Sequence, residues 1–159
     1  MKRVIGLLFL FIVAGLLTGC GSVTVPPSNV MKTDLQGFTL PLTPDENQAV
    51  LYVVRPSSGA PVVSFDVYID SQEKSDMIGH NDTKEYIYTV LSPGHHTIYS
   101  KAENWAKIEI EAKPNQTVFL EQIPKIGILF ARNELKQLDE LEGTYHVKHL
   151  ELGTLDSKE

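Results

Sequence analysis

Short segments of alternating apolar and polar residues, separated by turn residues, constrain this chain most. The clearest is 63–70, where Val63, Phe65, Val67 and Ile69 alternate with Ser64, Asp66, Tyr68 and Asp70. Successive side chains of a strand point to opposite faces, so this pattern predicts one core face and one solvated face. The other strands are expected at 49–55, 77–79, 86–91, 95–102, 105–112, 117–123 and 127–131. Short strands between turns indicate an antiparallel sandwich or barrel, and we expect a mainly β fold, an antiparallel β-sandwich of about seven strands.

A short C-terminal helix is expected after the last strand. Asp139 and Glu142 have the spacing of a capping box, which predicts a helix over 140–149. Gly143 weakens this prediction, because glycine costs about 1 kcal/mol relative to alanine inside a helix.

The N-terminus has the pattern of a signal peptide. Lys2 and Arg3 precede an uncharged apolar run over 4–17, which is shorter than the ~20 residues that a membrane-spanning helix needs. The alternative is an uncleaved N-terminal anchor helix. Leu17-Thr18-Gly19-Cys20, where the run ends at the only cysteine, resembles the lipobox of bacterial lipoproteins. The resemblance implies that 1–19 is removed and that Cys20 is lipidated, which would hold the chain at a membrane through its lipid anchor.

The same resemblance implies a cell-envelope location. Gly21 and Ser22 follow the cysteine, and an Asp at the second position would favour retention in the inner membrane. In a Gram-negative host the resemblance therefore implies an outer-membrane lipoprotein that faces the periplasm.

Three further segments follow the signal peptide. Composition rich in Ser, Thr and Pro predicts that 20–47 is the lipidated cysteine with a flexible tether, although Phe38, Leu40 and Leu42 alternate and could dock along the domain as an edge segment. The β-sandwich domain is expected over 48–155, and 156–159 is expected to be a frayed tail.

Charge and cysteine content exclude several function classes. The chain carries a net charge of −6, and removal of Lys2 and Arg3 with the signal peptide leaves −8. An acidic chain of this kind is repelled by nucleic acid and by anionic lipid headgroups, so no nucleic-acid partner is expected. With Cys20 lipidated, no thiol is left for a disulfide or for catalysis.

Three motifs resemble a known family. Tyr52-Val53-Val54-Arg55-Pro56-Ser57-Ser58, Phe65-Asp66-Val67-Tyr68-Ile69-Asp70 and Leu91-Ser92-Pro93-Gly94-His95-His96-Thr97 look like the bacterial lipoprotein family called domain of unknown function 2846. The resemblance covers about 49–152 and implies a prealbumin-like or PEGA-like sandwich that binds or assembles rather than catalyses. Ser71-Gln72-Glu73 departs from the family pattern, which commonly has Gly-Lys there.

Candidate binding residues are one arginine and a set of aromatic residues. Arg55 could pair with Asp66 or Asp70 inside the domain, which we expect, or with a carboxylate of a partner. The aromatic residues expected on the solvated faces are Tyr68, Tyr86, Tyr88, Tyr99 and Trp105. Such rings are common at protein interfaces and sugar-binding platforms, but they could also fill an inner face.

Histidine pairs are the candidates for metal ligation. His95 and His96 should point to opposite faces of a strand, whereas His146 and His149 share one helix face. No companion cysteine accompanies them, so no metal site is expected. The sequence also contains no nucleophile elbow, phosphate-binding glycine loop or metalloprotease pattern, so we expect neither an enzyme nor a cofactor.

Three functional hypotheses remain open. The first is a non-catalytic, membrane-tethered module that binds a protein or a glycan of the envelope. The second is a structural or assembly subunit of an envelope complex that pairs with another chain through an edge strand. The third is an enzyme whose site is assembled from residues distant in sequence.

Overall fold

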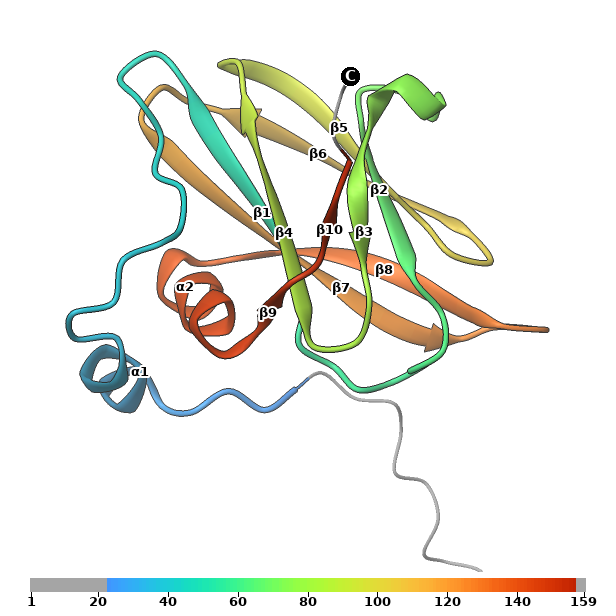
Figure 1. The fold of residues 1–159 in the computed structure, drawn as a ribbon, viewed down its shortest axis with the longest axis horizontal. Coiled ribbons are helices and arrows are strands. Elements are labelled where there is room, and N and C mark those ends of the chain that lie inside the picture. The colour runs from blue at the N-terminus through green and yellow to red at the C-terminus, as the bar shows by residue number, and fades with distance from the viewer. Residues whose placement is uncertain (1–22, 157–159) are drawn as a thin grey trace, which may run out of the picture.

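Two five-stranded sheets pack face to face in the computed structural model, which describes residues 23–156 (Figure 1). The strand orders are β8-β7-β1-β4-β9 and β10-β3-β2-β5-β6. The strands are β1 (Ala49–Arg55), β2 (Phe65–Ile69), β3 (Met77–Asn81), β4 (Glu85–Leu91), β5 (Gly94–Lys101), β6 (Trp105–Ala112), β7 (Gln116–Ile126), β8 (Ala131–Leu138), β9 (Glu151–Leu152) and β10 (Thr154–Leu155). The predicted mainly β sandwich is confirmed, and two strands of two residues each bring the number in the described chain to ten.

Most strand pairs are antiparallel, but β1 runs parallel to β7, and β4 parallel to β9. β1 lies at the centre of its sheet, and every one of its residues is buried. Its alternate side chains enter two separate cores. Leu51 and Val53 pack between the sheets with Val67 and Ile98, while the other side of β1 belongs to a second core on the outer face of that sheet. A strand covered on both faces explains the continuous apolar run.

The alternation predicted for 63–70 appears in β2. Phe65 and Val67 are fully buried, and Ile69 packs against the core between the sheets. The prediction of a strand over 127–131 is wrong. β7 already ends at Ile126, the next residues form the turn of a hairpin, and the chain re-enters the sheet as β8.

The predicted C-terminal helix is α2 (Glu140–His149), with Asp139 as its N-cap. The Asp139 carboxylate accepts a hydrogen bond from the Glu142 N–H at 2.8 Å. Gly143 faces the sheet, since a Cβ there would lie 2.2 Å from Cγ of Phe119. The residue that disfavoured the helix by propensity therefore allows the helix to approach β7 closely.

The segment expected to be a tether is folded against the domain from residue 28 onward. Residues 28–34 form the helix α1 (Ser28–Asp34), which lies beside α2 (Figure 1). The Asp34 carboxylate forms an ion pair with Lys148 of α2 at 3.1 Å and contacts the His149 imidazole at 2.8 Å. Phe38, Leu40 and Leu42 then pack against the second core, on the outer face of the first sheet rather than along a sheet edge. The alternation of these three apolar residues in the sequence is the pattern that indicated docking on the domain.

The predicted signal peptide and Cys20 lie outside the described residues, as do 157–159 of the predicted frayed tail. Asp156 is the last described residue, and its N–H donates to the Ile78 carbonyl at 3.0 Å. A short 3₁₀ helix (Lys74–Asp76) connects β2 to β3. Within 23–156, no helix has the length and apolar character required to span a membrane.

Candidate functional site

The outer face of the β10-β3-β2-β5-β6 sheet displays three aromatic residues from adjacent strands. Tyr68 of β2 pairs with Tyr99 of β5, and Trp105 begins β6. The Trp105 ring lies 5.2 Å from the Tyr68 ring and 6.4 Å from the Tyr99 ring, which it meets edge to face. We call these three residues the aromatic platform.

Exposure differs among the members of the aromatic platform. Tyr68 is buried, Tyr99 is half-buried and Trp105 is 39% exposed. Tyr68 thus lies on the face predicted to be solvated, yet it is buried, and the Trp105 ring packs 5.2 Å from its own ring. The platform offers the Trp105 ring as its most accessible apolar surface.

Polar groups of both charges border the aromatic platform. The Lys101 ammonium lies 5.3 Å from the centroid of the Trp105 ring, within the range of a cation–π contact. The Tyr68 hydroxyl donates to the Asp66 carboxylate at 3.5 Å, and Asp66 is the residue opposite Lys101 in the β2–β5 register. Burial first, and the Asp66 charge second, raise the pKa of Tyr68, so this hydroxyl stays a donor at neutral pH.

Tyr86 and Tyr88 belong to the opposite side of the sandwich. They lie on β4 in the second core, where their rings are 6.1 and 5.4 Å from the ring of Tyr52. Tyr86 is buried and Tyr88 half-buried beneath the segment that contains Leu42. Their prediction as parts of one contact surface with Tyr68 and Trp105 is wrong, because the two pairs belong to different sheets. The sequence pattern gives the face of each strand but not the sheet to which the strand belongs.

Tyr52 ties the docked N-terminal segment to this second core. Its hydroxyl accepts from the Leu42 N–H and donates to the Leu42 carbonyl, each at 2.8 Å. Burial raises the pKa of Tyr52 to about 12.

Arg55 is fully buried at the end of β1 and holds a loop of the main chain. Its guanidinium donates to the carbonyls of Val63, Gly59 and Ala60 in the β1–β2 loop, and to that of Asn81 on β3, at 2.5 to 3.2 Å. The expected ion pair with Asp66 or Asp70 is wrong, because these carbonyl oxygens take the guanidinium donors instead. Burial lowers the pKa of Arg55, while the charges of Asp82 and Glu85 raise it.

A buried polar network continues from Arg55 into the core. Asn81 donates to the Val53 carbonyl and to the Gln122 side chain, both at 2.9 Å, and Gln122 donates to the Ser100 hydroxyl at 2.8 Å. Because Ser100 and Gln122 lie on different sheets, the network links the two layers. Sequence reasoning missed this network. Its only signal was polar residues at core positions of the alternating strands, since Gln122 and Ser100 occur where an apolar residue is expected.

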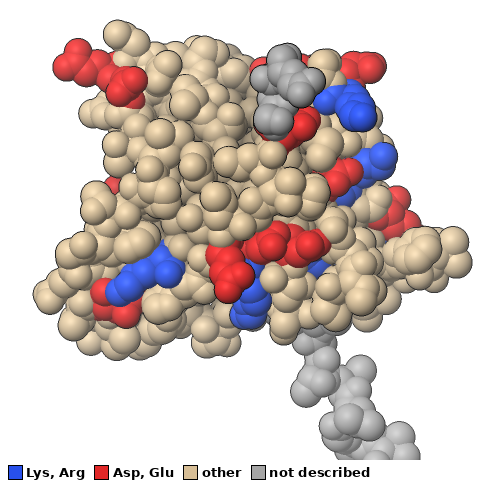
Figure 2. Space-filling view, viewed as in Figure 1, with Lys and Arg blue, Asp and Glu red and all other residues tan. Residues whose placement is uncertain are grey.

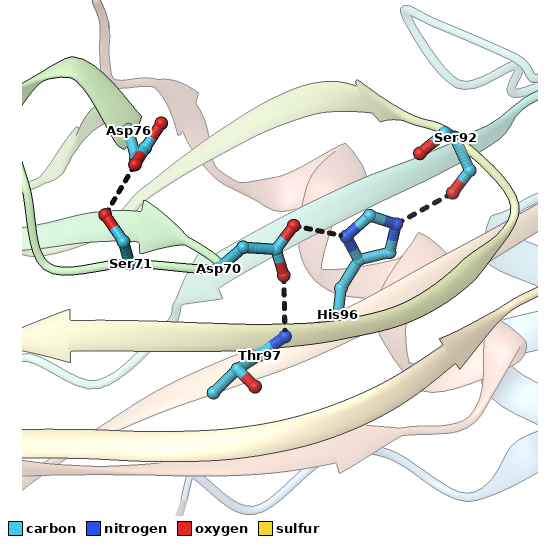
Figure 3. Close-up of polar contacts among 6 residues, drawn as sticks. All are labelled: Asp70, Ser71, Asp76, Ser92, His96 and Thr97. Atoms are coloured by element: carbon cyan, nitrogen blue, oxygen red, sulfur yellow. Dashed lines mark hydrogen bonds and ion pairs between the residues drawn. The ribbon is translucent and has the colours of Figure 1, made fainter.

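His95 and His96 point to opposite sides of β5, as predicted. His95 lies 2.6 Å from Glu111 on the outer face. His96 contacts the Asp70 carboxylate through Nδ1 and the Ser92 carbonyl through Nε2, both at 2.8 Å (Figure 3). The other Asp70 oxygen accepts from the Thr97 N–H at 2.9 Å. Burial lowers the pKa of His96, but its two acceptors outweigh burial and the net shift is upward.

This arrangement resembles part of a catalytic triad only in composition. Nε2 of His96 faces a main-chain carbonyl, whereas a general base requires that nitrogen to reach a nucleophile. The contacts instead join the turn that follows β2 to the turn between β4 and β5 (Figure 3).

His146 and His149 are not brought together as ligands. His146 is buried against the sheet, and the His149 imidazole contacts Asp34 of α1. Although the Glu142 carboxylate lies 3.9 Å from His146, burial dominates and lowers the pKa of His146 to about 4. Over the described residues, no three His, Cys, Asp or Glu side chains cluster as a metal site would require.

The hairpin between β7 and β8 displays an apolar tip that sequence reasoning placed in a strand. Ile126, Ile128, Leu129 and Phe130 are between 69% and 86% exposed. The hairpin projects at the lower right of the molecule, and the corresponding projection bears no charged residue in the space-filling view (Figures 1 and 2). The sequence signal for this tip is that the apolar run continues past the buried part of β7, so its last residues have no place in the core.

Comparison with known proteins adds no relative. No protein-family model matches the chain, and no curated protein matches it significantly.

Proposed function

We propose that the chain is a lipid-anchored, non-catalytic module of the bacterial outer membrane that faces the periplasm and binds a glycan of the envelope. The anchor rests on the lipobox-like sequence that ends at Cys20. The resemblance to the lipoprotein family of domain of unknown function 2846 is part of the same proposal. One observation supports the binding role most directly, and it is the accessible Trp105 ring on the aromatic platform.

The two outer faces of the sandwich differ in a way that favours this surface. The first sheet is covered by α2 and by Phe38, Leu40 and Leu42, which bury its aromatic residues. The aromatic platform lies on the second sheet, and Trp105 keeps 39% of its surface in contact with solvent. Among the described elements, α2 packs against the first sheet and α1 packs against α2.

A glycan matches the chemistry of this platform. Aromatic rings offer large, rigid contact area for the apolar C–H face of a sugar. Asp66 provides an acceptor for sugar hydroxyls, and Lys101, whose ammonium lies over the Trp105 ring, provides a donor. Ring and polar groups come from three adjacent strands, so the site is formed before a ligand arrives.

Edge-strand pairing has less support from the geometry. β9 and β10, at two of the four sheet edges, contain two residues each. The other two edges are β6 and β8, which contact one another and carry outward charged residues such as Lys107, Glu109 and Glu134. Short strands and edge charges are the devices by which proteins prevent strand addition.

Trp105 is the only tryptophan of the chain, so its fluorescence reports directly on the platform. The full chain, purified in detergent, would be titrated with soluble peptidoglycan strands and with lipopolysaccharide core oligosaccharide. We expect a saturable change in emission with at least one of them. Tyr99→Ala should weaken that binding about fivefold, because aromatic contacts of this kind contribute on the order of 1 kcal/mol each.

Tyr145→Ala, on α2 and outside the platform, is the matched control and should leave the affinity unchanged. A folded chain whose emission does not change with either glycan would refute the glycan proposal. The anchor is tested separately by mass spectrometry of the N-terminal peptide, which should begin at an acylated Cys20, with Cys20→Ala as the unacylated control.

A further inference from the structure

The tip of the β7–β8 hairpin is built to expose apolar side chains. Ile126 is 82% exposed, Ile128 86%, Leu129 81% and Phe130 69%. Large apolar residues that gather on a projecting loop at such exposure mark an interaction surface, whereas single exposed ones are ordinary. We call residues 126–130 the apolar tip.

The Glu103 carboxylate fixes the main chain of the apolar tip. Glu103 lies in the turn between β5 and β6 and accepts hydrogen bonds from the N–H groups of Ile128, Leu129 and Phe130, at 2.8 to 3.1 Å. These main-chain hydrogen bonds lower the pKa of Glu103, so it remains a carboxylate. Gly127 is required for this contact, since a Cβ there would lie 2.3 Å from the Glu103 carboxylate.

These three hydrogen bonds lower the free-energy cost of moving the tip from water toward an apolar phase. A loop that leaves water for an apolar phase must find partners for its main-chain N–H groups, or lose free energy for each one left unpaired. In the apolar tip, three consecutive N–H groups already have a partner within the protein. The side chains of the tip can therefore enter an apolar layer without leaving these N–H groups unpaired, while the Glu103 carboxylate that binds them stays in water at the boundary.

A neighbouring loop extends the same surface. Gly59 and Ala60 of the β1–β2 loop line an open depression together with residues 124–131. Arg55 holds this loop through its carbonyls, and Val62 within it is 93% exposed. Two loops, each fixed by one charged side chain, thus lie next to each other at Gly59 and Ala60.

Cations lie at the base of the apolar tip. Lys125 and Arg132 face each other across the β7–β8 pair, one directly before the apolar tip and the other two residues after it. Lys125 contacts Glu134 at 2.9 Å, with nearly half of its side chain exposed, and the charge of Arg132 helps to lower the pKa of the Glu103 carboxyl. Apolar residues at the end and cations behind them match the order of acyl chains and phosphates in a membrane surface.

We propose that the apolar tip inserts into the interface of a lipid bilayer and so orients the domain on the membrane. We assign a lipid bilayer as the partner because the hairpin projects from the domain, its main-chain N–H groups are already hydrogen-bonded to Glu103, and Lys125 and Arg132 lie at its base. It also rests on the proposed lipid anchor, because a lipid on Cys20 keeps the domain close to a bilayer and lets a weak insertion suffice.

Tryptophan fluorescence with brominated lipids tests this proposal in the full chain. Trp105→Phe removes the native fluorophore, and Phe130→Trp then places a single one in the apolar tip. In vesicles of phosphatidylethanolamine and phosphatidylglycerol, we expect brominated acyl chains to reduce the emission of this variant about twofold, as interfacial burial of 5–10 Å implies. Adding Ile128→Ser and Leu129→Ser should restore most of the emission.

The matched control carries Trp105→Phe with Lys113→Trp, in the turn at the other end of β7. Its emission should not respond to brominated lipid. Absence of quenching at position 130, or equal quenching at both positions, would overturn the proposal. A tip that instead resists quenching and is buried by a co-purifying protein would also overturn it. Mass spectrometry of Cys20 reports on the anchor independently, so the failure of one proposal is distinguishable from the failure of the other.

Discussion

Arg55 and Glu103 carry opposite charges, and each uses its charge to fix the main chain of a loop. Arg55 binds carbonyls of the β1–β2 loop, and Glu103 binds N–H groups of the β7–β8 tip. The planar guanidinium suits Arg55 to several acceptors at once, which a lysine ammonium does not match. Neither residue needs a charged partner, because each binds main-chain groups instead. A charged side chain that is buried or faces a loop can therefore serve to fix the conformation of that loop and need not indicate catalysis.

His146 predicts acid sensitivity of the fold. Because its pKa falls to about 4 in the folded protein and is about 6.5 when unfolded, the unfolded chain binds the proton first as pH falls. Its contribution is fully present above pH ~6.5 and is lost as pH falls toward ~4. Between pH ~7 and ~4.5, the free energy of unfolding in urea should fall by about 2 to 3 kcal/mol more in the native chain than in His146→Gln.

His95→Gln is the control for this measurement, since the His95 side chain is 92% exposed. Its pH profile should follow that of the native chain. A His146→Gln profile parallel to the native one would show that His146 is not the residue responsible.

At the scale of elements, α2 depends on close approach to β7. Alanine is favoured over glycine in a helix by about 1 kcal/mol, so propensity alone predicts that Gly143→Ala stabilises the protein. The added Cβ would instead lie 2.2 to 2.5 Å from atoms of Phe119. We expect Gly143→Ala to lower the free energy of unfolding by about 1 to 3 kcal/mol, as overpacking does.

Two further variants separate packing from propensity. Thr144→Ala in the same helix should change stability by less than about 0.5 kcal/mol. The double variant Gly143→Ala with Phe119→Leu should lose less stability than the two single losses added together, because the smaller side chain makes room. A higher melting temperature for Gly143→Ala alone would contradict this account of the helix.

The sequence predicts elements with strong local signals better than it predicts their neighbours. Asp139 and Glu142 locate α2, and the alternation around Phe65 and Val67 locates β2, because caps and strand periodicity are local. The apolar run at 127–131 imitates a strand, and only the distant Glu103 explains why it is a turn. The acceptors of Arg55 likewise lie in the β1–β2 loop, and no local sequence pattern predicts the conformation of that loop.

At the scale of the whole molecule, the N-terminal segment belongs to the folded unit. Phe38, Leu40 and Leu42 cover the second core, so the double variant Phe38→Ser, Leu40→Ser should lower the free energy of unfolding by about 2 kcal/mol. Val30→Ser, at an exposed position of α1, should have little effect. If all three substitutions are without effect, the segment is a free tether in solution.

The position of β1 between β4 and β7 has a consequence for how the chain reaches its folded state. β4, the antiparallel neighbour of residues 49–55, ends at Leu91, but β7, their parallel neighbour, ends only at Ile126. A pairing so distant along the chain is slow to form, since a long loop must close first. During synthesis, the most apolar strand therefore stays unprotected until most of the chain has emerged. A ribosome that stalls before β7 is complete would leave an aggregation-prone fragment, which quality-control proteases can recognise.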